Sequence, residues 1–163
     1  MGFDVPVPCG SSMGFEPAST GDVRTLRTTA RESEAYWGYD TVFLDEFDST
    51  FNITGEFISS FPVFVSREKG EIIAFWGAVP DGVQCELEYF YISRSVLKHG
   101  YGKCLWNHFT GWCRDNGIRE ITFVTSWEAV GFYLKMGAVQ DGTSRSVIDG
   151  REIPHFVYTL KYN

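Results

Sequence analysis

The chain has 163 residues, enough for one domain with a buried core. Its hydrophobic fraction of 44% and charged fraction of 21% are ordinary for a globular protein. The net charge of -7 argues against nucleic acid as a partner, because nucleic-acid binders need a basic surface. No apolar run reaches the length of a membrane span, so no membrane partner is expected.

The start of the chain and the cysteines bear on localisation and metal binding. Residues 1–12 lack the basic start and the apolar stretch of a signal peptide, so we expect a flexible extension before a single domain over 13–163. The cysteines form no CxxC pair, and no histidine stands at zinc-ligand spacing from them, which predicts no metal site. We expect four reduced thiols in a cytoplasmic protein: Cys9, Cys85, Cys104 and Cys113.

The first part of the chain has helical patterns separated by polar breaks. A short strand is expected at residues 15–18, where Pro17 suits an edge. Apolar residues at helical spacing predict helices at residues 23–37, 42–47 and 54–58. The expected N-caps are Ser19 or Thr20, Asp40 or Thr41, and Thr54.

The remaining pattern changes to period two. It predicts an antiparallel meander at residues 63–65, 72–79 and 84–92. A helix over 100–116 then leads to a strand at 118–125, which such a crossover makes parallel to the strand before it. A short helix at 127–136 and two strands at 138–147 and 154–160 follow. We therefore expect an α/β (α+β) fold, a mixed and mostly antiparallel sheet of about six or seven strands flanked by helices.

One segment carries a candidate anion site. A strand runs into a loop and then into a helix whose first turn contains Gly100-Tyr101-Gly102. Helix N-termini expose unpaired N–H groups, and glycine allows a bulky anion to approach the backbone. The segment lacks the Lys-Ser/Thr of a P-loop and the third glycine of a dinucleotide fold. Taken alone, it fits a phosphate cradle and a simple tight turn equally well.

Three further side chains are candidates for proton transfer. Glu86 and Glu88 stand two residues apart on one expected strand, so their side chains share a face, where like charges raise the pKa of at least one of them. A carboxylate with a raised pKa suits a general base. Tyr133 lies on a short helix, where its hydroxyl is a candidate proton donor. The structural alternatives are a solvated strand face for the glutamates and a core position for the tyrosine.

Together these pieces resemble the GNAT superfamily of acyl-CoA-dependent N-acetyltransferases. The resemblance rests on the segments 86–103 and 131–137 and on the order of elements over 15–160. The family's loop usually begins with Arg or Gln, whereas this chain has Leu97. The front half is also similar to an uncharacterised bacterial-type subgroup, through the helix end around Trp37-Gly38-Tyr39 and the turn at 150–154.

The resemblance implies acetyl-CoA as cosubstrate and direct transfer to an amine, without a metal. The backbone near Tyr91 and Ile92 would pair with the pantetheine arm, and Glu86, in preference to Glu88, would be the base. Tyr133 would protonate the leaving thiolate. The nucleophilic alternative, Cys85, has no neighbouring histidine in the sequence. The pyrophosphate would lie on the backbone amides of Leu97, Lys98, His99, Gly100, Tyr101, Gly102 and Lys103.

Several alternatives stay open at this point. The acceptor is a primary amine of either a small molecule or a peptide, and Trp37 and Tyr39 either line its pocket or pack a helix end. Family habit suggests a homodimer through the last strands. The rival functions are a non-catalytic acyl-CoA sensor with the same cradle and an aromatic ligand-binding domain without CoA.

Overall fold

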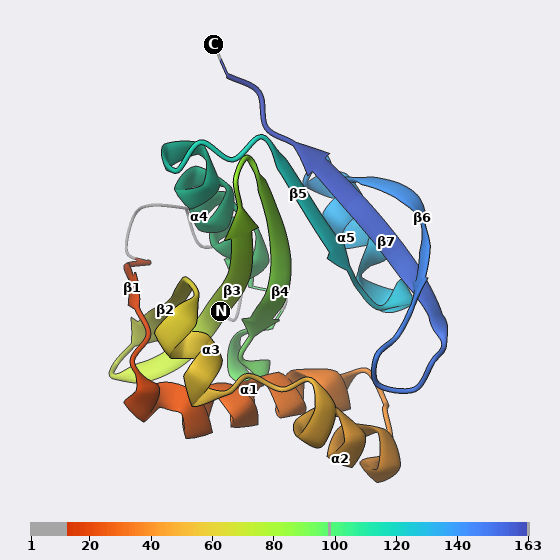
Figure 1. The fold of residues 1–163 in the computed structure, drawn as a ribbon. Helices are drawn as coiled ribbons and strands as arrows, with labels where there is room; N and C mark the ends of the chain where they lie inside the picture. The colour runs from red at the N-terminus through yellow and green to blue at the C-terminus, as the bar shows by residue number, and fades with distance from the viewer. Residues whose placement is uncertain (1–12, 98, 163) are drawn as a thin grey trace, which may run out of the picture.

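The computed structural model describes residues 13–97 and 99–162. The expected extension over 1–12 and the expected cofactor contact of Lys98 lie outside these residues. Seven strands form one sheet in the order β1-β2-β3-β4-β5-β7-β6 (Figure 1). The strands are β1 Phe15–Pro17, β2 Val63–Glu68, β3 Glu71–Asp81, β4 Gln84–Ile92, β5 Glu120–Val124, β6 Val139–Arg145 and β7 Glu152–Thr159. All neighbouring pairs are antiparallel except β4 and β5, which confirms the expected mixed sheet.

Five helices flank this sheet: α1 Val23–Tyr36, α2 Thr41–Thr50, α3 Gly55–Ser60, α4 Tyr101–Asp115 and α5 Val130–Lys135. Two of the expected caps are confirmed, since the Asp40 side chain accepts the Phe43 N–H and the Thr54 hydroxyl accepts the Phe57 N–H. Ser19 instead stands at the N-cap of a 3-10 turn, Thr20–Asp22, and the N-cap of α1 is Asp22. The helix expected at 127–136 is shorter, because its first turn, Trp127–Ala129, is a 3-10 turn.

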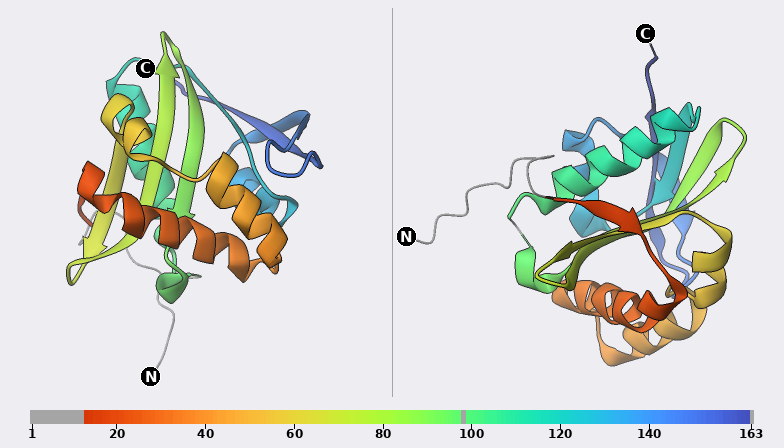
Figure 2. Two further views of the ribbon diagram at one scale, coloured as in Figure 1. Left: turned by 60° about the horizontal axis from the view of Figure 1, so that its bottom comes forward. Right: turned by 90° about the vertical axis from the view of Figure 1, so that its left-hand side faces the viewer.

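The helices cover the two faces of the sheet separately. α1 and α4 lie on opposite sides of the strands (Figure 2). One core cluster joins Leu105 and Phe109 of α4 to Trp76 of β3, whereas the other joins Leu26 of α1 to Phe75. Successive residues of β3 therefore point into different cores, as a strand buried on both faces requires.

The cysteines do not all match the expectation from sequence. Cys85 and Cys113 are buried free thiols, as expected. Cys104, near the start of α4, is instead disulfide-bonded, so the expectation of a reduced thiol is wrong there. Its spacing from the other cysteines in sequence gives no sign of this, because pairing depends on proximity in the folded chain. Cys9 lies outside the described residues.

Gly102 allows α4 to pack closely against α5. A Cβ at this position would stand 2.9 Å from Cε1 of Phe132 and 3.3 Å from Cδ1 of Ile92. The first contact is closer than side chains tolerate, and the obstacle is a rigid ring. Gly102 is thus explained by helix packing, independently of any ligand.

We predict that Gly102→Ala lowers the free energy of unfolding by about 1–3 kcal/mol through this overlap. Gly111 is the matched control, because it lies in the same helix and a Cβ there meets no atom within 4 Å. Gly111→Ala should raise stability by about 0.5–1 kcal/mol, the helix preference of alanine. Urea unfolding of both variants measures this, and equal effects would contradict the packing argument.

Candidate active site

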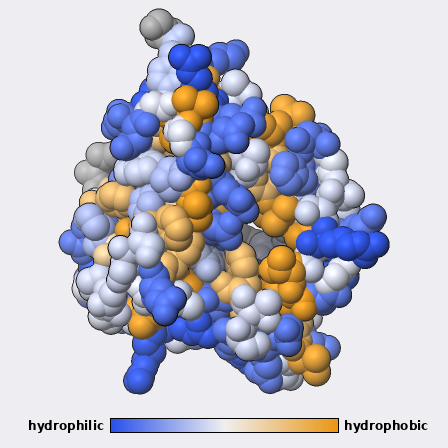
Figure 3. Space-filling model, in the orientation of Figure 1, coloured by the Kyte–Doolittle hydropathy of each residue, from blue (hydrophilic) through white to orange (hydrophobic). Residues whose placement is uncertain are grey.

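A pocket of about 420 Å³ lies between β4 and β5 and extends to the end of α1 and to α2. It is the hollow to the right of the centre in Figure 3, bordered by hydrophobic side chains. Its walls come from five parts of the chain: the end of α1, α2 with the residue after it, β4, the end of β5 with α5, and the β6–β7 connection. Segments far apart in sequence therefore meet here.

The pocket exists because β4 and β5 separate. Their parallel pairing is limited to three residue pairs, from Gln84 with Glu120 to Glu86 with Thr122. Beyond this point the two strands diverge (Figure 1), and residues of both line the pocket. The backbone edge of β4 after Glu86 consequently has no partner strand.

The alternation of hydrogen bonds shows which β4 groups face this open edge. The N–H of Ser93 donates to the carbonyl of Ile73 on β3, at 2.8 Å. In an antiparallel ladder every second residue bonds the same neighbour, so Tyr91 also faces β3. The backbone groups of Phe90 and Ile92 therefore point toward the gap. Ile92, expected at the pantetheine arm, thus lies on the open edge, whereas Tyr91 contributes its side chain.

β4 contains a β-bulge at the second of the two glutamates. Gly77 of β3 pairs with Tyr89, but the next residue, Ala78, pairs with Leu87, so Glu88 is the extra residue. The bulge changes which residues face which core: Leu87 packs with the α4 cluster, and Tyr89 packs with the α1 cluster. Glu86 and Glu88 both line the pocket, so the two carboxylates selected from the sequence do lie in one site.

The two carboxyl groups differ in environment. Glu88 is partly buried, whereas Glu86 is exposed. Burial, together with a hydrogen bond and repulsion from the Glu86 carboxyl, raises the pKa of Glu88 to about 8. Because the two groups are coupled, the proton belongs in part to the pair. The Glu88 carboxyl is therefore mostly protonated at neutral pH, and it becomes a proton acceptor as the pH rises toward and through 8.

Tyr133 lies in the pocket floor, with 6% of its surface exposed. Its ring centroid is 4.6 Å from that of Phe123 and 5.0 Å from that of Phe132. Burial raises the pKa of its phenol above the ordinary value, and the Thr125 hydroxyl acts in the opposite direction. Tyr133 therefore keeps its proton at neutral pH and can donate it. Tyr133 is thus both a core residue and a residue of the pocket lining, the two roles that the sequence left as alternatives.

The first turn of α4 opens at Gly100, whose φ of 86° is left-handed and favours glycine. Among the residues that the structure describes, no side chain forms a capping hydrogen bond at this helix end, so its N–H groups can bind a ligand. The Tyr101 side chain is buried and its hydroxyl donates to Glu68 at 2.9 Å, so at this residue only the backbone can contact a ligand. Lys103 is exposed in this turn, while Leu97 and His99 lie in the loop before it.

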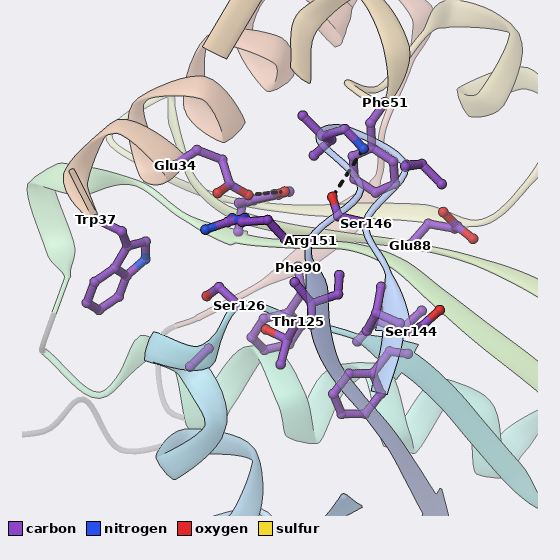
Figure 4. A pocket seen from close by; sticks show the side chains of 18 of the residues that line it. Glu34, Trp37, Phe51, Glu88, Phe90, Thr125, Ser126, Ser144, Ser146 and Arg151 are labelled. Atoms are coloured by element: carbon purple, nitrogen blue, oxygen red, sulfur yellow. Dashed lines mark hydrogen bonds between the residues drawn. The ribbon is translucent and has the colours of Figure 1, made fainter. Parts of the chain in front are cut away.

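The sequence did not predict the wall of the pocket that contains Glu34 and Arg151. Glu34 of α1 accepts a hydrogen bond from the Tyr91 hydroxyl at 2.8 Å, and Arg151 reaches toward it from the β6–β7 connection (Figure 4). The Arg151 guanidinium carbon is 5.1 Å from the centre of the Tyr39 ring. Trp37 and Tyr39 do line the pocket, as one of the two alternatives held. No local pattern could reveal Glu34, because its partner is 57 residues away.

In the described part of the chain, no group of three or more His, Cys, Asp or Glu is arranged to hold a metal ion. Across residues 13–97 and 99–162, no helix combines the length and apolar character needed to cross a membrane.

We predict that one glutamate titrates near pH 8 in the folded protein, as measured by NMR of side-chain carboxyl carbons. Glu86→Gln should lower that midpoint, because the neighbouring negative charge is removed while burial remains. Glu88→Gln should abolish it. A folded pKa above the unfolded value also means that stability falls as pH rises from the unfolded pKa through about 8. A Glu88 midpoint within the ordinary range would contradict this description.

Comparisons with known proteins identify the family. Residues 25–138 match the family model described as acetyltransferase (GNAT) family. No curated protein sequence matches the chain.

Solved structures share the fold at low sequence identity. PaiA N-acetyltransferase from Thermoplasma acidophilum, in complex with coenzyme A, has 17% identity and a TM-score of 0.73, over 91% of this chain and 99% of that one. The ribosomal-protein-S18-alanine N-acetyltransferase of Escherichia coli has 14% identity and a TM-score of 0.71, over 93% and 96%. With the family match covering most of the sequence, the chain belongs to the GNAT family of acetyltransferases.

Proposed function

We propose that the protein transfers the acetyl group of acetyl-CoA to a primary amine of a small molecule or peptide by direct attack. The observation that carries this proposal is the open backbone edge of β4, with Glu88 at its bulge and Tyr133 in the same pocket. These elements supply a binding edge, a proton acceptor and a proton donor in one cleft. The crystallised relatives include one described with coenzyme A, which supports the same choice.

The residues present fit acetyl-CoA at two places. The uncapped first turn of α4, with Gly100 in the left-handed region, suits a pyrophosphate, and Lys103 adds positive charge. The free backbone groups of Phe90 and Ile92 suit the amides of a pantetheine arm, as a strand edge does for an extended chain. The bound thioester supplies an activated acetyl group. The chain's contribution is to hold it against β4 and to move protons on either side of it.

An ammonium must lose a proton before its nitrogen can attack. Of the two carboxylates, Glu88 suits this task better, because its pKa of about 8 is close to the working pH. The sequence-based preference for Glu86 stays a prediction, and Glu86 acts at least by raising the pKa of its neighbour. The N–H of Ile92 faces the side where carbonyl charge would develop. When the new C–N bond forms and the C–S bond breaks, Tyr133 gives its proton to the sulfur, the attacking nitrogen loses its second proton to water, and Tyr133 regains a proton from solvent.

The non-catalytic sensor is the competing function. Turnover separates the two, because a sensor binds acetyl-CoA without releasing free thiol when amines are added. Thiol release and acetylated-amine mass spectrometry over a panel of amines would test the proposal. Acetyl-CoA binding with no turnover of any amine, including peptides, would favour the sensor.

We predict that Tyr133→Phe lowers kcat by roughly 10²–10⁴-fold, the usual size of general-acid assistance. The aromatic contacts of the ring are kept, so the melting temperature and the affinity for CoA should change little. Stopped assays with acetyl-CoA and calorimetry with CoA measure the two effects. An unchanged kcat would mean that water protonates the thiolate.

A second prediction concerns the first turn of α4. Lys103→Glu should weaken CoA binding at least tenfold, because it puts a negative charge at the turn proposed to bind the pyrophosphate. Lys161→Glu is the control, since Lys161 is also exposed but lies near the C-terminus, away from α4's first turn. Equal losses of affinity in both variants would point to overall charge and would remove the support for this binding turn.

A further inference from the structure

The far end of the pocket holds a carboxylate that proton transfer does not use. Glu34 lies toward the opposite end of the pocket from Glu88 (Figure 4). Among the described residues its one hydrogen-bond donor is the neutral Tyr91 hydroxyl, and no described cation forms an ion pair with it. A carboxylate held inside a cavity without a paired cation favours a cationic ligand.

Arg151 compensates the negative charge of Glu34 only in part. Its Nε forms an ion pair with Asp149 at 2.7 Å, and its guanidinium lies over the rings of Tyr39 and Phe43. Tyr39 in turn approaches Glu128 at 3.4 Å. The carboxylates of Glu34, Glu128 and Asp149 thus surround the single guanidinium of Arg151. A second arginine of the pocket lining, Arg145, donates to the Gly150 carbonyl at 3.1 Å. This balance disfavours an acceptor that carries a carboxylate, since each arginine already has its partner.

The second feature is aromatic. Trp37 lines the same end of the pocket as Glu34 and keeps 42% of its surface exposed (Figure 4). Aromatic faces attract organic cations within about 6 Å of the ring. A carboxylate and an accessible indole at one end of a pocket are therefore a combination suited to an alkylammonium group. Burial raises the pKa of Glu34, and the Tyr91 hydrogen bond and the charge of Arg151 offset this only in part.

We propose that the acceptor is a diamine or polyamine, whose second ammonium is bound by Glu34 and Trp37 while the reacting nitrogen lies at Glu88. This inference rests on the proposed acetyl transfer. Tyr91, which contacts Glu34, is three residues beyond Glu88 on β4, about 10 Å at strand rise. The two nitrogens are therefore separated by a flexible chain of several carbons. Glu34 is a specificity residue and takes no part in the proton transfers.

The test compares 1,6-diaminohexane with hexylamine, which share their chain length and differ in the second nitrogen. We expect the wild-type protein to acetylate the diamine with the higher kcat/KM. Glu34→Gln keeps an acceptor for the Tyr91 hydroxyl, so folding should be preserved. It should raise KM for the diamine roughly 10- to 100-fold, as loss of one charge-assisted hydrogen bond would. kcat, and both constants for hexylamine, should change little.

Glu32→Gln is the matched control, because Glu32 is on the same helix but exposed, outside the pocket. It should leave the diamine preference intact. Calorimetry of 1,6-diaminohexane binding to the CoA-loaded protein gives a readout independent of turnover. Binding that weakens in Glu34→Gln without any turnover would overturn acetyl transfer and keep the diamine site. Turnover of hexylamine and the diamine with equal kcat/KM, or equal losses in Glu34→Gln and Glu32→Gln, would overturn the diamine site alone.

Discussion

The early end of the β4–β5 pairing is the constraint on which the rest of this structure depends. A sheet interior normally satisfies every backbone group of a central strand. Here the parallel ladder stops at Glu86, so the N–H and C=O groups of Phe90 and Ile92 are left facing a cavity within the sheet. Such an edge is costly unless water or a ligand occupies it. The proposed function assigns this edge to the pantetheine arm.

The aromatic core holds the separated strands in position. Phe90 and Phe123 both pack against Tyr133 across the gap, with centroid separations of 5.8 Å and 4.6 Å from the tyrosine. These aromatic side chains therefore both belong to the core and line the pocket. The same rings bury the Tyr133 phenol, so the packing that keeps the cleft open also raises the pKa of the proposed donor.

Much of the fold could be predicted from the sequence, since helical spacing, turn residues and caps are local signals. The caps Asp40 and Thr54 and the antiparallel meander are examples. Glu86, Glu88 and Tyr133 could be selected because they stand next to a recognisable turn and helix, and the pocket brings all three together. The Glu88 bulge could not be predicted, because it depends on how β3 and β4 pair. Glu34 and Arg151 could be assigned to the site only from the tertiary structure, because their neighbours come from distant segments of the chain.

The central claim is that acetyl-CoA lies along the open edge of β4 with its pyrophosphate on the first turn of α4. A crystal structure of the protein with acetyl-CoA tests this most directly. The account predicts hydrogen bonds from the pantetheine arm to the backbone of Phe90 and Ile92, and the thioester between Glu88 and Tyr133. Acetyl-CoA bound elsewhere, with the β4 edge occupied only by water, would contradict it.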